Sequence, residues 1–99
     1  MVKVGEHITL DIIGTKREYS QSFFEKLLYK IAKKAKVTVL EISRHNFEPQ
    51  GFTLIALLAE SHISFHTFPE HGIISFDFFT CGKITPSVAI DIIKNEIDH

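Results

Sequence analysis

The turns between residues 52 and 80 constrain the fold of this chain more than any other feature, because they are too short for a parallel crossover. Three segments rich in β-branched and aromatic residues follow one another there, at 52–59, 62–68 and 73–80. Short stretches separate them, and the longer one contains Pro69 and Gly72. A parallel connection needs a dozen or more residues, so the sequence predicts antiparallel hairpins.

The rest of the chain adds two strands and two helices to these hairpins. Residues 7–13 alternate as a half-buried strand does, and 37–42 is β-branched, with a continuation to residue 47. A helix is predicted from Ser20 or Ser22 to Ala35, and a second one with Thr85 as N-cap and Pro86 in its first position. The almost wholly apolar segment 52–59 is predicted to be a strand buried on both faces or a core strand near the centre of the sheet.

This order predicts an α+β fold, a two-layer sandwich in which two helices cover one face of an antiparallel sheet. A chain of 99 residues is long enough for a single domain. Large apolar residues are also expected on the second face of the sheet. A second copy of the chain is the simplest cover for that face, so we expect a homodimer.

Charge and cysteine content exclude several classes of function. The formal net charge is -1, which does not suit a nucleic-acid-binding protein. One cysteine excludes an internal disulfide framework. We expect a cytoplasmic protein without membrane association, because no signal peptide or long apolar run is present.

The segment 59–82 concentrates polar and nucleophilic side chains between Phe and Ile residues, and three interpretations compete. A metal site would use His62, His66, His71 and Cys81, but their spacing fits no zinc motif, so no metal is expected. Nucleophilic catalysis would pair Ser61 or Cys81 with His66 or His62, although no third member is recognisable. The third interpretation is self-cleavage at the Glu60–Ser61 bond.

Self-cleavage uses the serine hydroxyl as an internal nucleophile. The Ser61 hydroxyl attacks the preceding carbonyl and moves the acyl group from nitrogen to oxygen. Elimination of that ester leaves dehydroalanine, which hydrolyses to a pyruvoyl group and ammonia. The reaction needs a hydroxyl at a strained turn, a base and a donor for the oxyanion.

Three motifs carry a resemblance to a known family. They are Phe-Glu-Pro-Gln-Gly at 47–51, Leu-Ala-Glu-Ser-His-Ile-Ser-Phe-His-Thr-Phe-Pro-Glu at 58–70, and Asp-Phe-Phe-Thr-Cys-Gly at 77–82. With the early Gly-Glu-His at 5–7, they closely resemble the small prokaryotic S-adenosylmethionine decarboxylase proenzymes. The resemblance spans most of the chain from residue 5 to the final helix.

The resemblance implies a role for each motif residue in cleavage and catalysis. Ser61 would become a covalent pyruvoyl group after cleavage into chains 1–60 and 61–99. His66 would serve processing at Glu60 and Ser61, assisted by Thr53. Cys81 would be the acid that returns a proton to the product carbon.

The resemblance also implies the substrate and the assembly. Phe47 and Phe68 would sandwich the adenine of S-adenosylmethionine, and Glu70 would bind the ribose hydroxyls. The product would supply aminopropyl groups for spermidine and polyamine synthesis, and two protomers would form an αββα sandwich. Decarboxylation of arginine or ornithine, or a non-cleaving relative that binds a nucleoside-type ligand, are the alternatives.

Two positions depart from the family pattern. Thr53-Leu54 stands where the family usually has Ser-Gly, and we expect the leucine to add bulk beside the site. Phe68 stands at an adenine-stacking position that is often Trp.

Overall fold

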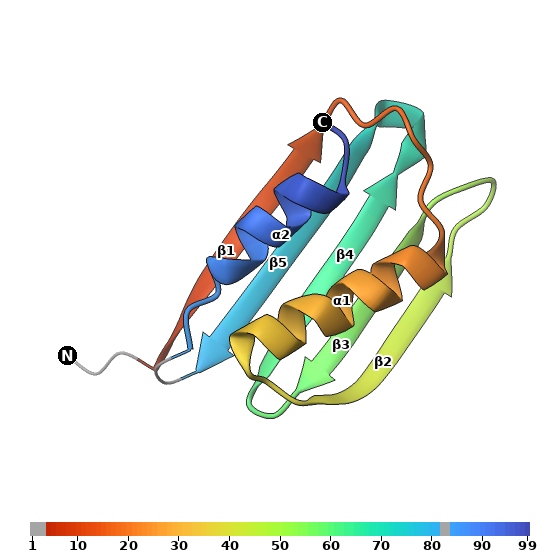
Figure 1. The fold of residues 1–99 in the computed structure, drawn as a ribbon. Coiled ribbons are helices and arrows are strands. Elements are labelled where there is room, and N and C mark those ends of the chain that lie inside the picture. The colour runs from red at the N-terminus through yellow and green to blue at the C-terminus, as the bar shows by residue number, and fades with distance from the viewer. Residues whose placement is uncertain (1–3, 82–83) are drawn as a thin grey trace.

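The computed structural model, which describes residues 4–81 and 84–99, is a five-stranded sheet covered on one face by two helices (Figure 1). Its elements in chain order are β1 (Gly5–Ile13), α1 (Gln21–Ala35), β2 (Val39–Asn46), β3 (Phe52–Leu58), β4 (Ser61–Phe68), the 3-10 turn η1 (Pro69–His71), β5 (Ile73–Cys81) and α2 (Val88–Glu96). The strand order is β1-β5-β4-β3-β2, and all neighbours are antiparallel. The predicted fold class is confirmed. Gly82, which ends the third motif, lies outside the described residues.

The first helix begins as predicted and the second does not. The Ser20 Oγ accepts a hydrogen bond from the backbone N–H of Phe23 at 3.1 Å, so Ser20 is the N-cap. The prediction of Thr85 as the second N-cap is wrong, because α2 begins only at Val88. Pro86 instead forms a tight turn ahead of the helix, in which its carbonyl accepts from the N–H of Ala89 at 3.1 Å. In the part of the chain described, no helix is long and apolar enough to cross a membrane.

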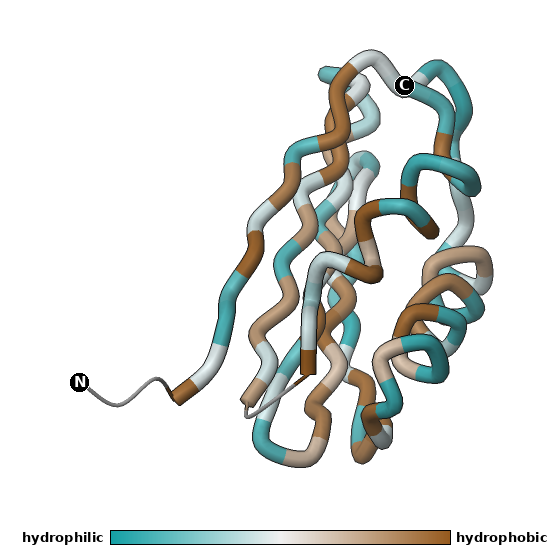
Figure 2. Tube along the Cα trace, turned by 60° about the vertical axis from the view of Figure 1, so that its left-hand side comes forward, coloured by the Kyte–Doolittle hydropathy of each residue, from teal (hydrophilic) through white to brown (hydrophobic). Residues whose placement is uncertain are grey.

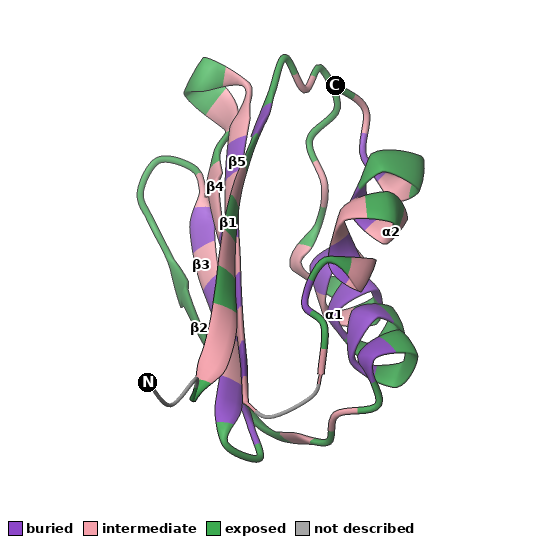
Figure 3. Cartoon of the chain, turned by 90° about the vertical axis from the view of Figure 1, so that its left-hand side faces the viewer, coloured by how far each residue is buried: buried purple, intermediate pink, exposed green. Residues whose placement is uncertain are grey.

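The core lies between the sheet and the helices (Figure 3). Phe24 of α1 sits at its centre, with its ring centroid 5.4 Å from that of Phe52 and 5.0 Å from that of Phe65. Burying a phenylalanine side chain stabilises a fold by about 1.5–3 kcal/mol. The fully buried large side chains include Phe24, Phe65, Phe78, Leu28, Ile31, Leu54, Leu58, Ile63 and Ile93. Their alternation along β3, β4 and β5 directs one face of each strand into this layer.

The other face of the sheet carries no helix, so it is open in a single chain (Figure 3). Of the two alternatives for 52–59, burial on both faces is wrong, because Ile55 and Leu57 of β3 are 42% and 52% exposed. A core strand near the sheet centre is the alternative that agrees with the structure, since β3 lies beside the central strand β4. Hydrophilic and hydrophobic residues alternate along the strands in Figure 2. The open face is apolar only in part, since its residues on β4 and β5 include His62, Ser64 and Asp77.

The C-terminus is bonded to the segment after β1, and this contact makes a pH-dependent contribution to stability. The Tyr19 hydroxyl donates to Asp98 at 2.6 Å, and the Lys16 N–H donates to it at 2.7 Å. These two bonds lower the pKa of the Asp98 carboxyl below its usual range. A carboxyl with a lowered pKa stabilises the fold above its ordinary pKa, and the contribution is lost as pH falls through the lowered value.

We therefore expect the Asp98→Asn variant to be less stable than the unchanged protein at pH values above the ordinary carboxyl pKa of about 4. The two proteins should converge in stability only as the pH falls below that value and through the lowered pKa of Asp98. The measurement is the urea midpoint of unfolding, followed by circular dichroism at several pH values. Asp91→Asn, which removes an exposed carboxyl on α2, is the matched control. A difference for Asp98→Asn that stayed constant with pH would contradict this account.

Candidate active site

The Glu60–Ser61 bond lies in a two-residue hairpin turn between β3 and β4. Leu58 pairs with Ser61, so only Ala59 and Glu60 form the loop. Glu60 has a φ of 65°, a left-handed backbone conformation that costs free energy in a residue other than glycine. The Ser61 hydroxyl is buried, and it is the one buried side-chain polar atom among the described residues that has no hydrogen-bond partner. A free hydroxyl thus adjoins a strained peptide.

Cys81 contacts this turn from the neighbouring strand. It is the last residue of β5, which pairs with β4. Its Sγ donates to the carbonyl oxygen of Glu60 at 2.7 Å. A donor on that oxygen stabilises the negative charge that develops there when the carbonyl carbon is attacked. The strand pairing therefore places a hydrogen-bond donor on the carbonyl oxygen of Glu60.

His66 and Thr53 lie elsewhere on the sheet. They pair across β4 and β3, and the Thr53 Oγ1 lies 2.9 Å from the His66 Nδ1. Ser61 is five residues before His66 on the same strand, which corresponds to about 16 Å. Its side chain also points to the opposite face, since side chains alternate along a strand. Within a single chain, His66 therefore does not reach the Glu60–Ser61 bond.

The residues expected to bind substrate lie at the same end of the sheet as the Thr53–His66 pair. Phe47 is in the β2–β3 loop and is 50% exposed, and Phe68 ends β4 and is 42% exposed. Glu70 in η1 accepts a hydrogen bond from the Gln50 side chain at 3.3 Å. Figure 1 shows η1 and the β2–β3 loop at the end of the sheet opposite to the β3–β4 turn.

The departure at Leu54 does not affect the open face of the sheet. Leu54 is fully buried in the core, whereas Thr53 beside it is bonded to His66. The expectation that Leu54 adds bulk beside the site is therefore wrong. The reason is the strand alternation, which turns the side chains of neighbouring residues to opposite faces.

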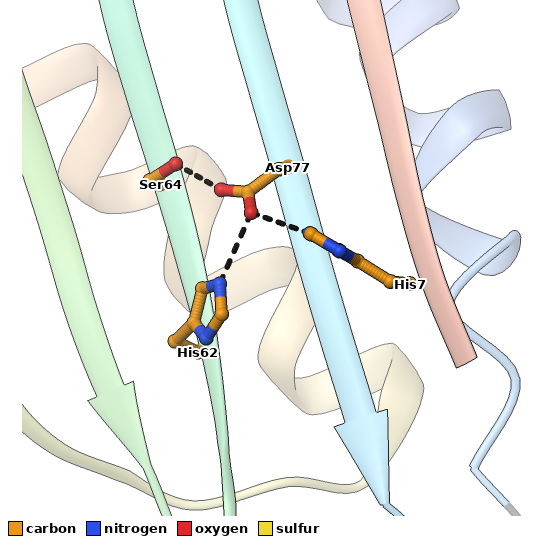
Figure 4. Close-up of polar contacts among 4 residues, drawn as sticks. All are labelled: His7, His62, Ser64 and Asp77. Carbon is orange, nitrogen blue, oxygen red and sulfur yellow. Dashed lines mark hydrogen bonds and ion pairs between the residues drawn. The ribbon is translucent and has the colours of Figure 1, made fainter. Parts of the chain in front are cut away.

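Asp77 is the centre of a polar cluster that the sequence did not reveal (Figure 4). Its carboxylate is hydrogen-bonded to His7 at 2.6 Å, to His62 at 3.0 Å and to the Ser64 hydroxyl. Partial burial alone would raise the pKa of Asp77, but these three hydrogen bonds outweigh it and hold the pKa below its usual value. Asp77 is therefore an anion at neutral pH.

The four residues that the sequence offered as metal ligands do not lie together in the structure. His71 lies exposed in η1, Cys81 contacts Glu60, and His66 is bonded to Thr53. The period of two along β4 puts His62 and His66 on one face, but each turns to a different neighbour. Only the sheet register, which pairs Ser64 with Asp77 and His7 with Phe79, could have predicted the cluster around Asp77.

Comparison with known proteins shows the family to which this chain is similar. A family model described as S-adenosylmethionine decarboxylase matches residues 6–99. The S-adenosylmethionine decarboxylase proenzyme of Parasynechococcus marenigrum (strain WH8102) is 42% identical over 97 residues, which cover 95% of this chain and 76% of the relative. The proenzyme of Methanococcus vannielii is 41% identical over 98 residues, covering 96% and 80% of the two chains.

A solved structure has the same fold. The crystal structure of the adenosylmethionine decarboxylase from Aquifex aeolicus VF5 superposes with a TM-score of 0.81. It is 34% identical and covers 95% of this chain and 80% of its own. The similarity in fold and in sequence therefore extends over nearly the whole of this chain. This chain belongs to the S-adenosylmethionine decarboxylase family.

Proposed function

We propose that this protein cleaves itself at Glu60–Ser61 and then decarboxylates S-adenosylmethionine for polyamine synthesis. The observation that carries the proposal is the 2.7 Å contact between the Cys81 Sγ and the carbonyl oxygen of Glu60. Family membership supports the substrate. A free thiol on Cys81 suits a reducing compartment such as the cytoplasm.

The first step is an acyl shift within the turn. The Ser61 Oγ loses its proton and attacks the carbonyl carbon of Glu60, and the Cys81 thiol stabilises the charge on the oxygen. The amide C–N bond then breaks as the Ser61 nitrogen takes a proton, which leaves the Glu60 acyl group on Oγ as an ester. A base then takes a proton from the α-carbon of Ser61, and the Cβ–Oγ bond of Ser61 breaks, with the new main-chain carboxylate of Glu60 as the leaving group. Water releases ammonia from the remaining dehydroalanine, which leaves a pyruvoyl group at the head of residues 61–99.

That pyruvoyl group would supply an electron-withdrawing carbonyl able to bond the substrate amine and to favour the loss of carbon dioxide. Cys81 holds a proton on its Sγ for the product carbon. The chain suits this chemistry because Ser61 is a free hydroxyl and Cys81 is already in contact with the peptide that is to be cut.

We propose further that the active site is shared between two copies of the chain. A base must lie within about 2.6–3.2 Å of the proton it takes, directly or through one water. Ser61 lies five residues before His66 on β4, a separation of about 16 Å along the strand, so one chain does not place this histidine beside the Glu60–Ser61 bond. In a two-fold dimer that pairs the open sheet faces, the end carrying Phe47, His66 and Glu70 of one protomer would lie against the Ser61 end of its partner.

The substrate is tested by carbon dioxide release from S-adenosylmethionine, arginine and ornithine. We expect release from S-adenosylmethionine alone, because Phe47 and Phe68 offer exposed ring faces to adenine and to the sulfonium cation. Glu70→Gln should raise the KM for S-adenosylmethionine about 10-fold or more, since hydrogen bonds to a charged acceptor contribute about 1.5–3 kcal/mol each.

The control variant is Glu48→Gln, which removes another exposed carboxylate from the same end of the sheet. It should leave the KM unchanged. Release from arginine or ornithine at a similar kcat/KM, or equal effects of the two substitutions, would contradict the substrate assignment.

A further inference from the structure

Three side chains from three adjacent strands converge on one point of the open sheet face. His7 of β1 and His62 of β4 both direct their Nε2 atoms to the Oδ2 of Asp77 on β5, at 2.6 and 3.0 Å (Figure 4). The three ligand atoms all lie within 4.8 Å of one another. Both ion pairs of Asp77 within the described residues are with these histidines. Two imidazoles and one carboxylate therefore share a small volume.

Neighbouring residues hold the three side chains in this arrangement. Phe79 lies beside both histidines, with its ring centroid 5.9 Å from that of His7 and 6.0 Å from that of His62. The Ser64 hydroxyl donates to the other oxygen of Asp77, which orients the carboxylate. Partners of this kind, which fix a ligand without touching the ion, are a regular feature of metal sites.

We propose that His7, His62 and Asp77 form a binding site for a divalent transition-metal ion of the zinc type. Imidazole nitrogen and carboxylate oxygen are donors that zinc prefers, and bonds of about 2.0–2.2 Å place tetrahedral ligand atoms roughly 3.3–3.5 Å apart. The contacts at 2.6 and 3.0 Å would open only slightly to admit an ion. Three protein ligands leave a fourth coordination position for water.

The site is separate from the cleavage chemistry, and the inference does not rest on the proposed function. Ser61 and Cys81 act at the β3–β4 turn, whereas the ion would join β1, β4 and β5 across their open face. In a cleaved protein it would also bind residue 7 of the first segment to residues 62 and 77 of the second. Its expected effect is to hold the two segments together.

The test uses the full chain with Ser61→Ala, so that the protein is uniform whether or not it can cleave itself. Zinc is titrated by calorimetry, and Co²⁺ is titrated by its visible absorption. We expect one ion per chain, and at least about 100-fold weaker binding in Asp77→Asn, because changes outside the ligand shell already cost 10–100-fold. His71→Gln removes an exposed histidine outside the cluster and should bind as tightly as the parent chain.

A second measurement does not require the Asp77→Asn variant to fold. Zinc added to the Ser61→Ala chain, in which the cluster is intact, should shift the side-chain NMR signals of His7 and His62 together. The signals of His71 should not change. Absence of binding at 100-fold excess of zinc over protein, or binding that Asp77→Asn leaves intact, would overturn the proposal. In either case the cluster is a hydrogen-bonded network only.

Discussion

A chain with Ser61→Ala should remain in one piece of 11.3 kDa, whereas the unchanged protein should separate under denaturing conditions into residues 1–60 and 61–99. The physical reason is the missing nucleophile, because alanine has no oxygen with which to attack the carbonyl carbon of Glu60. Denaturing intact-mass spectrometry distinguishes the two outcomes. We expect this one substitution to abolish cleavage completely.

The same variant should fold at least as stably as the unchanged protein. The Ser61 hydroxyl is buried without a partner, and an unsatisfied buried polar group costs about 1–3 kcal/mol. Removing it relieves that cost, so absence of cleavage in Ser61→Ala is not a sign of misfolding. Ser64→Ala, which removes another buried serine hydroxyl of β4, is the matched control and should still cleave. Cleavage that persisted in Ser61→Ala would refute the assignment of the nucleophile.

Production together with Ser61→Ala should restore cleavage to the His66→Ala chain, although each variant is inactive by itself. His66→Ala lacks the histidine but keeps Ser61, and Ser61→Ala lacks the nucleophile but keeps His66. If the site is shared, the His66→Ala chain is cleaved whenever its partner is Ser61→Ala. Random pairing in two-fold dimers puts about half of the His66→Ala chains in such a dimer. Intact-mass spectrometry separates the two chains by mass and measures this fraction.

The control for this experiment is a partner that carries both substitutions. It still pairs with the His66→Ala chain but offers no histidine, so no cleavage is expected. If His66→Ala cleaved at the normal rate by itself, His66 would not be the base, and His62 next to the bond would take its place as the candidate. If the mixture failed to cleave, the shared site would be wrong while the Ser61 assignment stood.

Local patterns in the sequence predicted most of the fold. The short turns between 52 and 80 allow only antiparallel pairing, and the strands β3, β4 and β5 form in that way. Ser20 begins the first helix because its hydroxyl reaches the N–H of Phe23, an interaction between residues three apart. Thr85 failed as the second cap because a tight turn at Pro86 delays the helix, and turns of this kind are weakly marked in sequence.

The candidate site was predicted only as a set of residues. The motif 58–70 identified Ser61, His66 and Glu70 together, because a resemblance reports shared residues and not their distances. The structure separated them, with Ser61 at one end of β4 and His66 towards the other. It also added the contact between Cys81 and Glu60, which depends on residues 21 apart in the chain.

By itself the sequence determined the strand alternation, the antiparallel hairpins and the residue types available for self-cleavage. Those features depend on residues close together in the chain, so a short segment of sequence contains the backbone preferences and the spacing that produce them. Only the tertiary structure decided that His7, His62 and Asp77 meet, that Leu54 points into the core, and that His66 cannot reach Ser61 in one chain. These outcomes depend on the register of the sheet, which all five strands set jointly through the apolar face that they bury against the helices.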